Sequence, residues 1–169
     1  MGVYSVDKLM AETRRLAAEY RRATGQPLAV SGEIAKHDAA RLLNLEVCHD
    51  PGLGYDAAGL EGPCEGKHVQ IKGRAIFDEK KSGQRIGQLR MEREWDAVVL
   101  VLMDEEFEPY EIHEADREVI EEALADSGDS SRAKRGAMSV AKFKNIARLV
   151  WTREEGVITD EIWDNQSGE

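Results

Sequence analysis

Three polar residues near the middle of the chain have the types and spacing to hold a metal ion and a water molecule. Gln70 and Lys72 lie two positions apart in a strand-like run over residues 68–74, and Asp56 lies in a second such run over residues 55–60. The residues between the runs include two glycines and a proline, which predict a turn. In the resulting hairpin, the carboxylate of Asp56 would meet the amide of Gln70 and the ammonium of Lys72. Oxygen ligands of this kind suit a hard divalent cation, which can activate a bound water molecule.

The alternation of side chains along residues 68–74 determines which of them share a face. Successive side chains of a strand point to opposite faces, so Val69 and Ile71 are expected to enter a core. The side chains expected on the opposite face are all polar: His68, Gln70, Lys72 and Arg74. The same residues also have a structural interpretation, in which the strand surface simply faces solvent and Asp56 only forms a salt bridge.

The neighbouring segments predict how this hairpin is positioned. Residues 31–43 have the apolar stripe of a helix, with Glu33 in the first turn, where the helix dipole favours a carboxylate. Residues 98–103 are continuously apolar and predict a buried strand, which residues 108–113 would pair with. We therefore expect an α/β fold in which a central mixed β-sheet is flanked by α-helices. Glu33 is expected to point toward Asp56.

The remaining elements complete one predicted domain over residues 1–153, with an N-terminal helix in residues 1–27 and the core in residues 28–153. Residues 154–169 are predicted to form an acidic C-terminal tail.

Further helices are predicted over residues 5–23, over residues 115–125 and from Ser139 onward. The apolar positions with helical spacing are Leu9, Leu16 and Tyr20 in the first of these helices, and Val140, Phe143, Ala147 and Val150 in the last. Residues 77–94 are polar and mixed in charge, and we expect a loop with a helical turn near residues 88–92.

Charge is distributed unevenly along the 169 residues, whose net charge is -10. Residues 104–126 contain 11 acids and one base, whereas residues 132–153 contain seven bases and no acid. This asymmetry predicts a basic side that could meet phosphates, although basic runs also occur on ordinary solvated helix faces. The residues expected to contact nucleic acid are Arg74, Lys81, Arg132, Lys134, Arg135, Lys142 and Lys144, with Lys67 as a further contributor.

Several classes of protein are disfavoured by the composition. No apolar run approaches the roughly 20 residues that a membrane span needs. The first residues lack the apolar region of a signal peptide, and Cys48 and Cys64 form no metal-ligand pattern, so a cytoplasmic, reducing location is expected. The four histidines lack the spacing of zinc ligands, and no nucleophile elbow or phosphate-binding glycine loop is present.

The order of a helix with Glu33, a strand with Asp56 and a strand with Gln70-Ile71-Lys72 resembles the PD-(D/E)XK, or restriction-endonuclease-like, nuclease superfamily. The Gln-x-Lys form is most similar to Mrr-type restriction enzymes. Over residues 28–152 the chain is also similar to a small bacterial domain family of uncharacterised function. The matching runs are Gly-Tyr-Asp, Gln-Ile-Lys-Gly-Arg, Trp-Asp-Ala-Val-Val-Leu-Val-Leu and Arg-Gly-Ala-Met-Ser-Val-Ala-Lys-Phe.

The resemblance implies a restriction-endonuclease-like core and a DNA endonuclease that depends on Mg²⁺ or Mn²⁺. Asp56 would be the central metal ligand, Gln70 would offer its amide oxygen or orient a metal-bound water, and the backbone carbonyl of Ile71 would complete the shell. Glu33 would reach a second metal position or a metal-bound water. Lys72 would position the attacking water, help to deprotonate it and stabilise the charge of the phosphate. The chain departs from the usual pattern because Gln70 carries no charge, which weakens the expected metal affinity.

The resemblance implies nucleic acid, with DNA expected, as one partner. Because no DNA-reading domain is evident, it also implies either a second copy of the chain or a separate specificity protein. Two other classes of function remain open. One is a non-catalytic module that binds nucleic acid or protein on the same fold, and the other is an enzyme or scaffold unrelated to nucleic acid.

Overall fold

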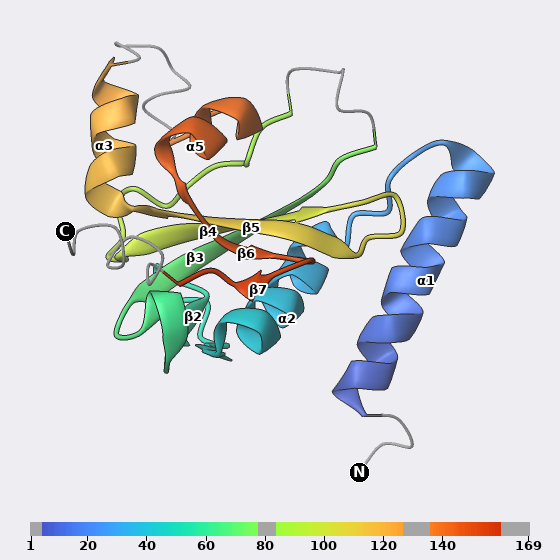
Figure 1. The fold of residues 1–169 in the computed structure, drawn as a ribbon. Helices are drawn as coiled ribbons and strands as arrows, with labels where there is room; N and C mark the ends of the chain where they lie inside the picture. The colour runs from blue at the N-terminus through green and yellow to red at the C-terminus, as the bar shows by residue number, and fades with distance from the viewer. Residues whose placement is uncertain (1–4, 78–83, 127–135, 160–169) are drawn as a thin grey trace, which may run out of the picture.

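The centre of the molecule is a mixed β-sheet (Figure 1). The computed structural model describes residues 5–77, 84–126 and 136–159. Within them the sheet has seven strands in chain order: β1 (Leu45–Val47), β2 (Ala57–Gly59), β3 (His68–Ala75), β4 (Ala97–Met103), β5 (Pro109–Asp116), β6 (Arg148–Thr152) and β7 (Gly156–Val157). Strands β3 and β4 run parallel, and the other neighbouring pairs run antiparallel. The predicted α/β fold with a central mixed sheet is confirmed.

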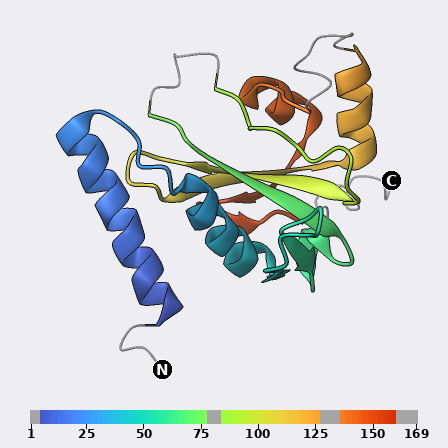
Figure 2. The ribbon, with the colours of Figure 1, turned by 180° about the vertical axis from the view of Figure 1, so that it is seen from behind.

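Helices cover both faces of this sheet, as Figures 1 and 2 show from opposite sides. Helix α2 (Ser31–Leu43) packs on one face. The other face is covered by α3 (Arg117–Asp126), α5 (Val140–Ile146) and residues 84–92, which we call the crossover segment because they lie between β3 and β4.

Strand β4 contributes to both apolar cores because it is buried over its whole length. Its alternate side chains point to opposite faces. Those in the core beneath α2 are Ala97, Val99, Val101 and Met103, and those in the core beneath α3 and α5 are Val98, Leu100 and Leu102. A continuous apolar run therefore gave a correct prediction of a strand that is buried on both sides.

The predicted hairpin is present, and its first strand is short. Strand β2 pairs antiparallel with β3, with Ala57 opposite Val69, and the backbone N–H of Asp56 donates to the carbonyl of Val69 at 2.8 Å. A Cβ on Gly59 would lie 1.8 Å from the carbonyl oxygen of Cys64, so only glycine lets the chain turn back here. Because β2 begins at Ala57, it pairs with β3 only as far as Val69. Beyond Val69, no described strand pairs with this edge of β3.

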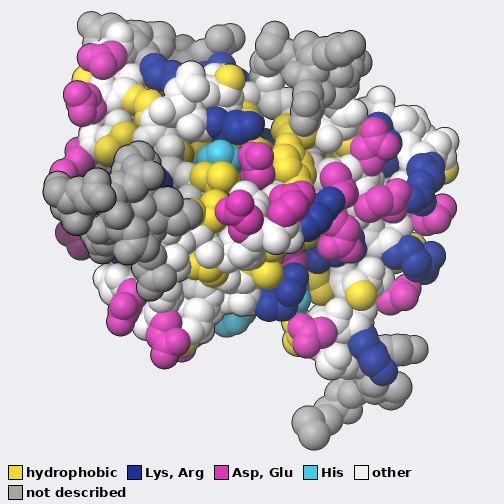
Figure 3. Space-filling model, viewed as in Figure 1, with side chains coloured by type: hydrophobic (Ala, Val, Ile, Leu, Met, Phe, Trp, Pro, Cys, Tyr) yellow, Lys and Arg dark blue, Asp and Glu magenta, His cyan; other side chains and the backbone are white. Residues whose placement is uncertain are grey.

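Helix α1 (Val6–Thr24) forms where it was predicted, with the side chain of Ser5 accepting from the backbone N–H of Lys8, but the predicted packing face is wrong. Leu9, Leu16 and Tyr20 are 52%, 52% and 43% exposed. Figure 3 shows acidic and basic side chains intermingled over this helix. The face that packs inward instead carries Ala17, Ala18 and Arg14.

The rotation of α1 follows from a buried ion pair. Asp38 on α2 is fully buried, and its two carboxylate oxygens accept from Arg14 Nη2 at 2.8 Å and Nη1 at 3.0 Å. A buried carboxylate is stable only if a cation and hydrogen bonds accompany it. Arg14 must therefore face α2, which turns the leucine stripe of α1 outward.

We expect Asp38→Ala to lower the free energy of unfolding by about 3–5 kcal/mol, because it removes the buried carboxylate that accepts two hydrogen bonds from the largely buried guanidinium of Arg14. Urea denaturation measures this loss. Glu12→Ala is the matched control, since it breaks an exposed pair with Arg15 and should change the stability little. Equal effects of the two substitutions would contradict the role given to the buried pair.

The predicted C-terminal helix is too long, because α5 ends at Ile146 and the chain enters β6 at Arg148. Val150 therefore lies in the sheet beside the α2 core, and it does not share a helix face with Phe143. Val150 is followed by Trp151 and Thr152, and the strand that they form pairs with β5. β-branched and aromatic residues of this kind favour strands.

Three other boundaries differ from the prediction. Strand β5 continues to Asp116, so Ala115 is in the sheet and α3 begins at Arg117. No helix forms over residues 88–92, where the chain has no regular structure before a turn at residues 91–92, which the N–H of Arg93 closes by donating to the carbonyl of Arg90 at 3.0 Å. Strand β7 pairs with β6, so the sheet extends beyond the domain boundary predicted at residue 153.

Candidate functional site

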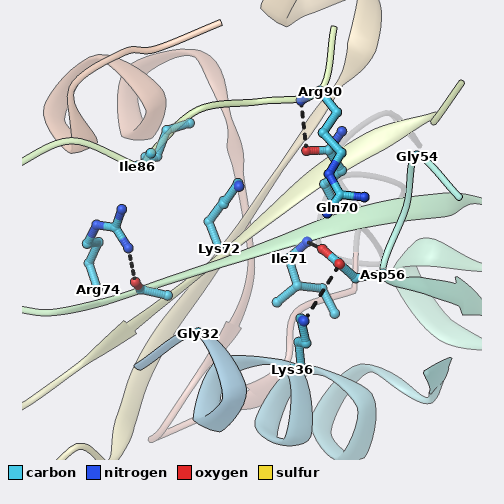
Figure 4. A pocket seen from close by; sticks show the side chains of 12 residues that line it. Gly32, Lys36, Gly54, Asp56, Gln70, Ile71, Lys72, Arg74, Ile86 and Arg90 are labelled. Atoms are coloured by element: carbon cyan, nitrogen blue, oxygen red, sulfur yellow. Dashed lines mark hydrogen bonds and ion pairs between the residues drawn. The ribbon is translucent and has the colours of Figure 1, made fainter. Parts of the chain in front are cut away.

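The uncovered edge of β3 borders a pocket of about 260 Å³. Figure 4 shows that its walls come from the N-terminal part of α2, the loop before β2 and the crossover segment. The lining residues that matter below are Lys36, Asp56, Gln70, Ile71, Lys72, Arg74 and Arg90. The structure thus brings together the three polar residues from which the sequence prediction began.

Asp56 lies just before β2 with its carboxylate held in one orientation. Its Oδ2 accepts from the backbone N–H of Ile71 at 2.8 Å, and its Oδ1 lies 3.9 Å from Lys36 Nζ. The hydrogen bond from β3 uses one carboxylate oxygen, so Oδ1 is the oxygen that remains for a ligand.

The backbone carbonyl of Ile71 lies at the same edge. In a strand, the N–H and C=O of one residue point to the same side. The N–H of Ile71 points to Asp56, and the carbonyl of His68, three residues earlier, bonds β4 on the other side through the N–H of Asp96 at 2.8 Å. The carbonyl of Ile71 therefore points toward the Asp56 side, as a metal ligand would have to.

Gln70 is buried, with 3% of its surface exposed. Its Oε1 accepts a long hydrogen bond of 3.4 Å from the backbone N–H of Arg90, and its Nε2 is buried without a hydrogen-bond partner in the described part of the chain. Buried amides are normally satisfied. Turning the amide over would make its oxygen available to a cation, but it would break this long bond and set the Nε2 donor against the backbone N–H of Arg90.

Lys72 Nζ donates to the backbone carbonyl of Gln88 at 2.9 Å. Burial lowers the pKa of Lys72, and the neighbouring cations Arg74, Arg90 and Lys36 lower it further, whereas Asp56 opposes them. This amine gives up its proton more readily than an ordinary lysine does, which suits a residue that accepts a proton from water.

The charge of the pocket favours anions. Four cations line it, from Lys36, Lys72, Arg74 and Arg90, and among the described lining residues Asp56 is the only carboxylate. Arg74 donates through Nη1 to the carbonyl of its neighbour Gly73 at 2.6 Å, which keeps the guanidinium beside β3. A concave surface with this excess of positive charge attracts phosphate groups.

Glu33 does not line the pocket, contrary to the expected approach toward Asp56. Its side chain is 73% exposed and its Oε1 contacts Lys36 Nζ at 3.4 Å, so it meets Asp56 only through this lysine. Lys36, one turn further along α2, takes the place expected for Glu33. Helical spacing from Glu33 could have identified Lys36, because residues three apart lie on the same side of a helix.

Arg90 was missed because the crossover segment has no periodic pattern. Two hydrogen bonds hold it at the pocket. Its carbonyl accepts from the nearby Trp95 Nε1 at 2.9 Å, and its Nη1 donates to the carbonyl of Leu53, distant in sequence, at 2.9 Å.

Of the residues expected to contact nucleic acid, those that the structure describes lie on three different elements or loops. Lys81, Arg132, Lys134 and Arg135 lie outside the described residues. Arg74 lines the pocket, whereas Lys142 and Lys144 lie on α5 and Lys67 bridges Glu114 and Asp116.

Three of the four described bases of the run over residues 132–153 face acids that are distant in sequence. Lys144 lies 3.7 Å from Glu111 on β5, Arg148 lies 2.7 Å from Glu114 and Arg153 lies 2.7 Å from Asp104. The run contains no acid in its sequence, but the folded chain brings acids from other segments next to its described part.

These residues fit a divalent cation only if a substrate shares in holding it. In the described part of the chain, no group of three or more His, Cys, Asp or Glu side chains is arranged to hold a metal. Asp56 Oδ1, the carbonyl of Ile71 and the amide of Gln70 would supply three oxygens. Mg²⁺ commonly binds through one or two carboxylates together with substrate phosphates and water, and the cations around the pocket suit such a phosphate.

Comparisons with models of known protein families and with curated proteins found no match to this chain. None of the described helices has the length and apolar character needed to cross a membrane.

Proposed function

We propose that this protein hydrolyses phosphodiester bonds of nucleic acid in a metal-dependent reaction, as an endonuclease acting on DNA with a restriction-endonuclease-like core. The observation that carries the proposal is the convergence of Asp56, Gln70, Ile71 and Lys72 on one pocket that has an excess of cations. The resemblance of these residues to the PD-(D/E)XK pattern supports it.

Each residue has a role that follows from its position. Asp56, Gln70 and the carbonyl of Ile71 would hold Mg²⁺ or Mn²⁺, which supplies charge stabilisation at the phosphate and a more acidic bound water. Lys72, with its lowered pKa, accepts the proton of the attacking water as the new P–O bond forms, and the leaving oxygen takes a proton from solvent as its bond to phosphorus breaks. Arg74 and other cations of the pocket hold the non-bridging phosphate oxygens.

The direct test incubates the purified protein with single-stranded DNA, double-stranded DNA and RNA. Each substrate is tested with Mg²⁺, with Mn²⁺ and with a chelator in place of the metal. We expect internal cleavage of DNA that requires the metal.

A second candidate is a non-catalytic module that binds nucleic acid through the same pocket. It is favoured by the single carboxylate facing four cations, because this balance suits an anion even without metal. Binding to DNA that weakens with added salt, together with no cleavage under any of the conditions above, would select this function.

Gln70→Glu is the most informative substitution for choosing between these functions. It adds a second carboxylate to the pocket, so we expect tighter Mn²⁺ binding, measured by calorimetry, and cleavage at lower metal concentration. Gln88→Glu is the matched control, because Gln88 is exposed and contributes to the pocket through its backbone carbonyl. If wild type is inactive and Gln70→Glu neither binds metal nor cleaves, the nuclease proposal fails in favour of the binding module.

We also propose that the protein acts in the cytoplasm and that a second copy or a separate specificity protein selects the DNA target. Cys48 and Cys64 are free thiols, as is common in reducing compartments. Light scattering of the free protein and of its DNA complex measures how many copies take part.

A further inference from the structure

We propose that the exposed ring of His68 is a platform on which an unpaired base of the substrate stacks, beside the phosphate held in the pocket. This inference rests on the proposed function and names the class of its substrate, a strand with an unpaired nucleotide next to the bound phosphate. His68 is then a binding residue for the base, and Tyr55 supports its ring from the inner side.

The first support is a pair of parallel aromatic rings next to the pocket. The rings of Tyr55 and His68 are stacked, with their centroids 4.1 Å apart and their planes 6° apart. Tyr55 also packs against the apolar core beneath α3 and α5, so it is the inner ring of the stack. The side chain of His68 is 51% exposed, which leaves its outer face accessible to a third ring.

The second support is the position of this stack at one end of the pocket. Tyr55 lies between Gly54 and Asp56, which both line the pocket, and His68 lies two residues before Gln70 on β3. Side chains two residues apart on a strand share a face and are about 7 Å apart. A nucleotide whose phosphate enters the pocket can therefore place its own base, or the base of its neighbour, on His68.

The third support is that the rings are held in place by contacts within the chain. The backbone N–H of His68 donates to Asp96 Oδ2 at 2.8 Å, and the Nδ1 of its ring lies 4.0 Å from the same oxygen. Asp96 and Tyr55 together restrict the rotation of the ring. A side chain that is already ordered loses little conformational entropy on binding, which favours its use in recognition.

Stacking on this ring selects an unpaired base and not a particular sequence. Every base has a π-face, so aromatic side chains stack with all four bases. In a duplex the neighbouring base pairs cover both faces, and a base has to leave the stack before a side chain can reach it. We therefore expect a single strand to bind more tightly than a blunt duplex of the same length.

The test measures the binding of fluorescent single-stranded DNA by anisotropy, with a chelator present so that no cleavage occurs. Wild type, His68→Ala and His68→Phe are compared on an intact oligonucleotide and on one of the same length with abasic sites. We expect His68→Ala to bind the intact strand about tenfold more weakly than wild type, the effect of losing one stacked base. On the abasic strand the same substitution should change the affinity less than about twofold.

Two further results separate stacking from other roles of His68. His68→Phe should bind the intact strand as wild type does, because phenylalanine also stacks on bases. His68→Ala should leave the salt dependence of binding unchanged, since stacking releases no counterions. His49→Ala is the matched control, because His49 is exposed in the loop between β1 and β2 and does not line the pocket. It should bind both strands as wild type does.

The inference is overturned if His68→Ala binds the intact strand as tightly as wild type, if it weakens both strands equally, or if wild type binds neither strand. If wild type cleaves DNA with metal but binds the intact and abasic strands equally, the inference fails and the proposed hydrolysis stands. If His68→Ala loses affinity only for the intact strand and wild type does not cleave, the inference stands and the proposed hydrolysis fails.

Discussion

Asp56→Asn is expected to reduce metal-dependent cleavage below detection while the protein keeps its fold. Asp56 is the only carboxylate among the described residues that line the pocket, so the substitution leaves the metal without a charged ligand. The amide oxygen of asparagine can still accept the hydrogen bond from the backbone N–H of Ile71, so the hairpin is retained. Nicking of supercoiled DNA with Mg²⁺ or Mn²⁺ measures the activity, and the urea midpoint verifies the fold.

Asp50→Asn provides the matched control for this substitution. Asp50 lies in the same loop, and its Oδ1 accepts from the backbone N–H of Gly52 at 2.8 Å, outside the pocket. We expect this variant to cleave as wild type does. Cleavage by Asp56→Asn at the wild-type rate would show that the reaction takes place elsewhere.

The same substitution separates catalysis from binding. Removing the carboxylate leaves four cations around the pocket without an opposing charge. Affinity for DNA in the absence of metal should therefore be equal to or higher than that of wild type. A loss of both cleavage and DNA affinity would instead indicate that Asp56 supports the structure of the site.

The hairpin and the faces of β3 could be predicted because the signals are local. The alternation of Val69 and Ile71 with Gln70 and Lys72 has the period of a strand and needs no knowledge of the rest of the chain. Helical spacing places Glu33 and Lys36 on the same side of α2, but it does not decide which of the two side chains reaches Asp56. That choice depends on how α2 is rotated against the sheet, and this rotation follows from packing with β3 and α1.

The charges of residues 132–153 show that counting acids and bases along the sequence does not predict a basic surface. The acids that face three of its described bases lie on β5 or in the turn between β4 and β5, and the pairing of β5 with β6 sets Glu114 opposite Arg148. An antiparallel pairing brings such residues together regardless of their separation in the chain. Likewise, the buried pair of Arg14 and Asp38 determined the rotation of α1, although leucine spacing indicated a different face.

Lys72→Met is expected to lower the rate of cleavage by about 10²- to 10⁴-fold, the usual contribution of a positioned acid or base. Metal binding should persist, because Asp56 and the carbonyl of Ile71 remain. As a base, Lys72 must lose its proton, and its pKa is lower than that of an ordinary lysine. The wild-type rate should therefore rise with pH and level off above this lowered pKa, and the rise should be absent in Lys72→Met. A variant that keeps both the rate and the pH profile would remove Lys72 from the mechanism.

The stability of the same variant gives a readout that does not depend on activity. A lysine whose pKa is lowered by folding makes the folded state less stable at low pH, where the buried amine must carry a charge. Wild type should therefore gain stability relative to Lys72→Met as pH rises from the lowered pKa toward that of an ordinary lysine.

Lys67 provides the opposite case, because burial lowers its pKa but Asp116 and Glu114 outweigh this effect and raise it. Wild type should lose stability relative to Lys67→Met as pH rises from the ordinary lysine value through the raised pKa. Urea denaturation across this pH range measures both trends, and parallel trends in the two variants would contradict the charge environment assigned to Lys72.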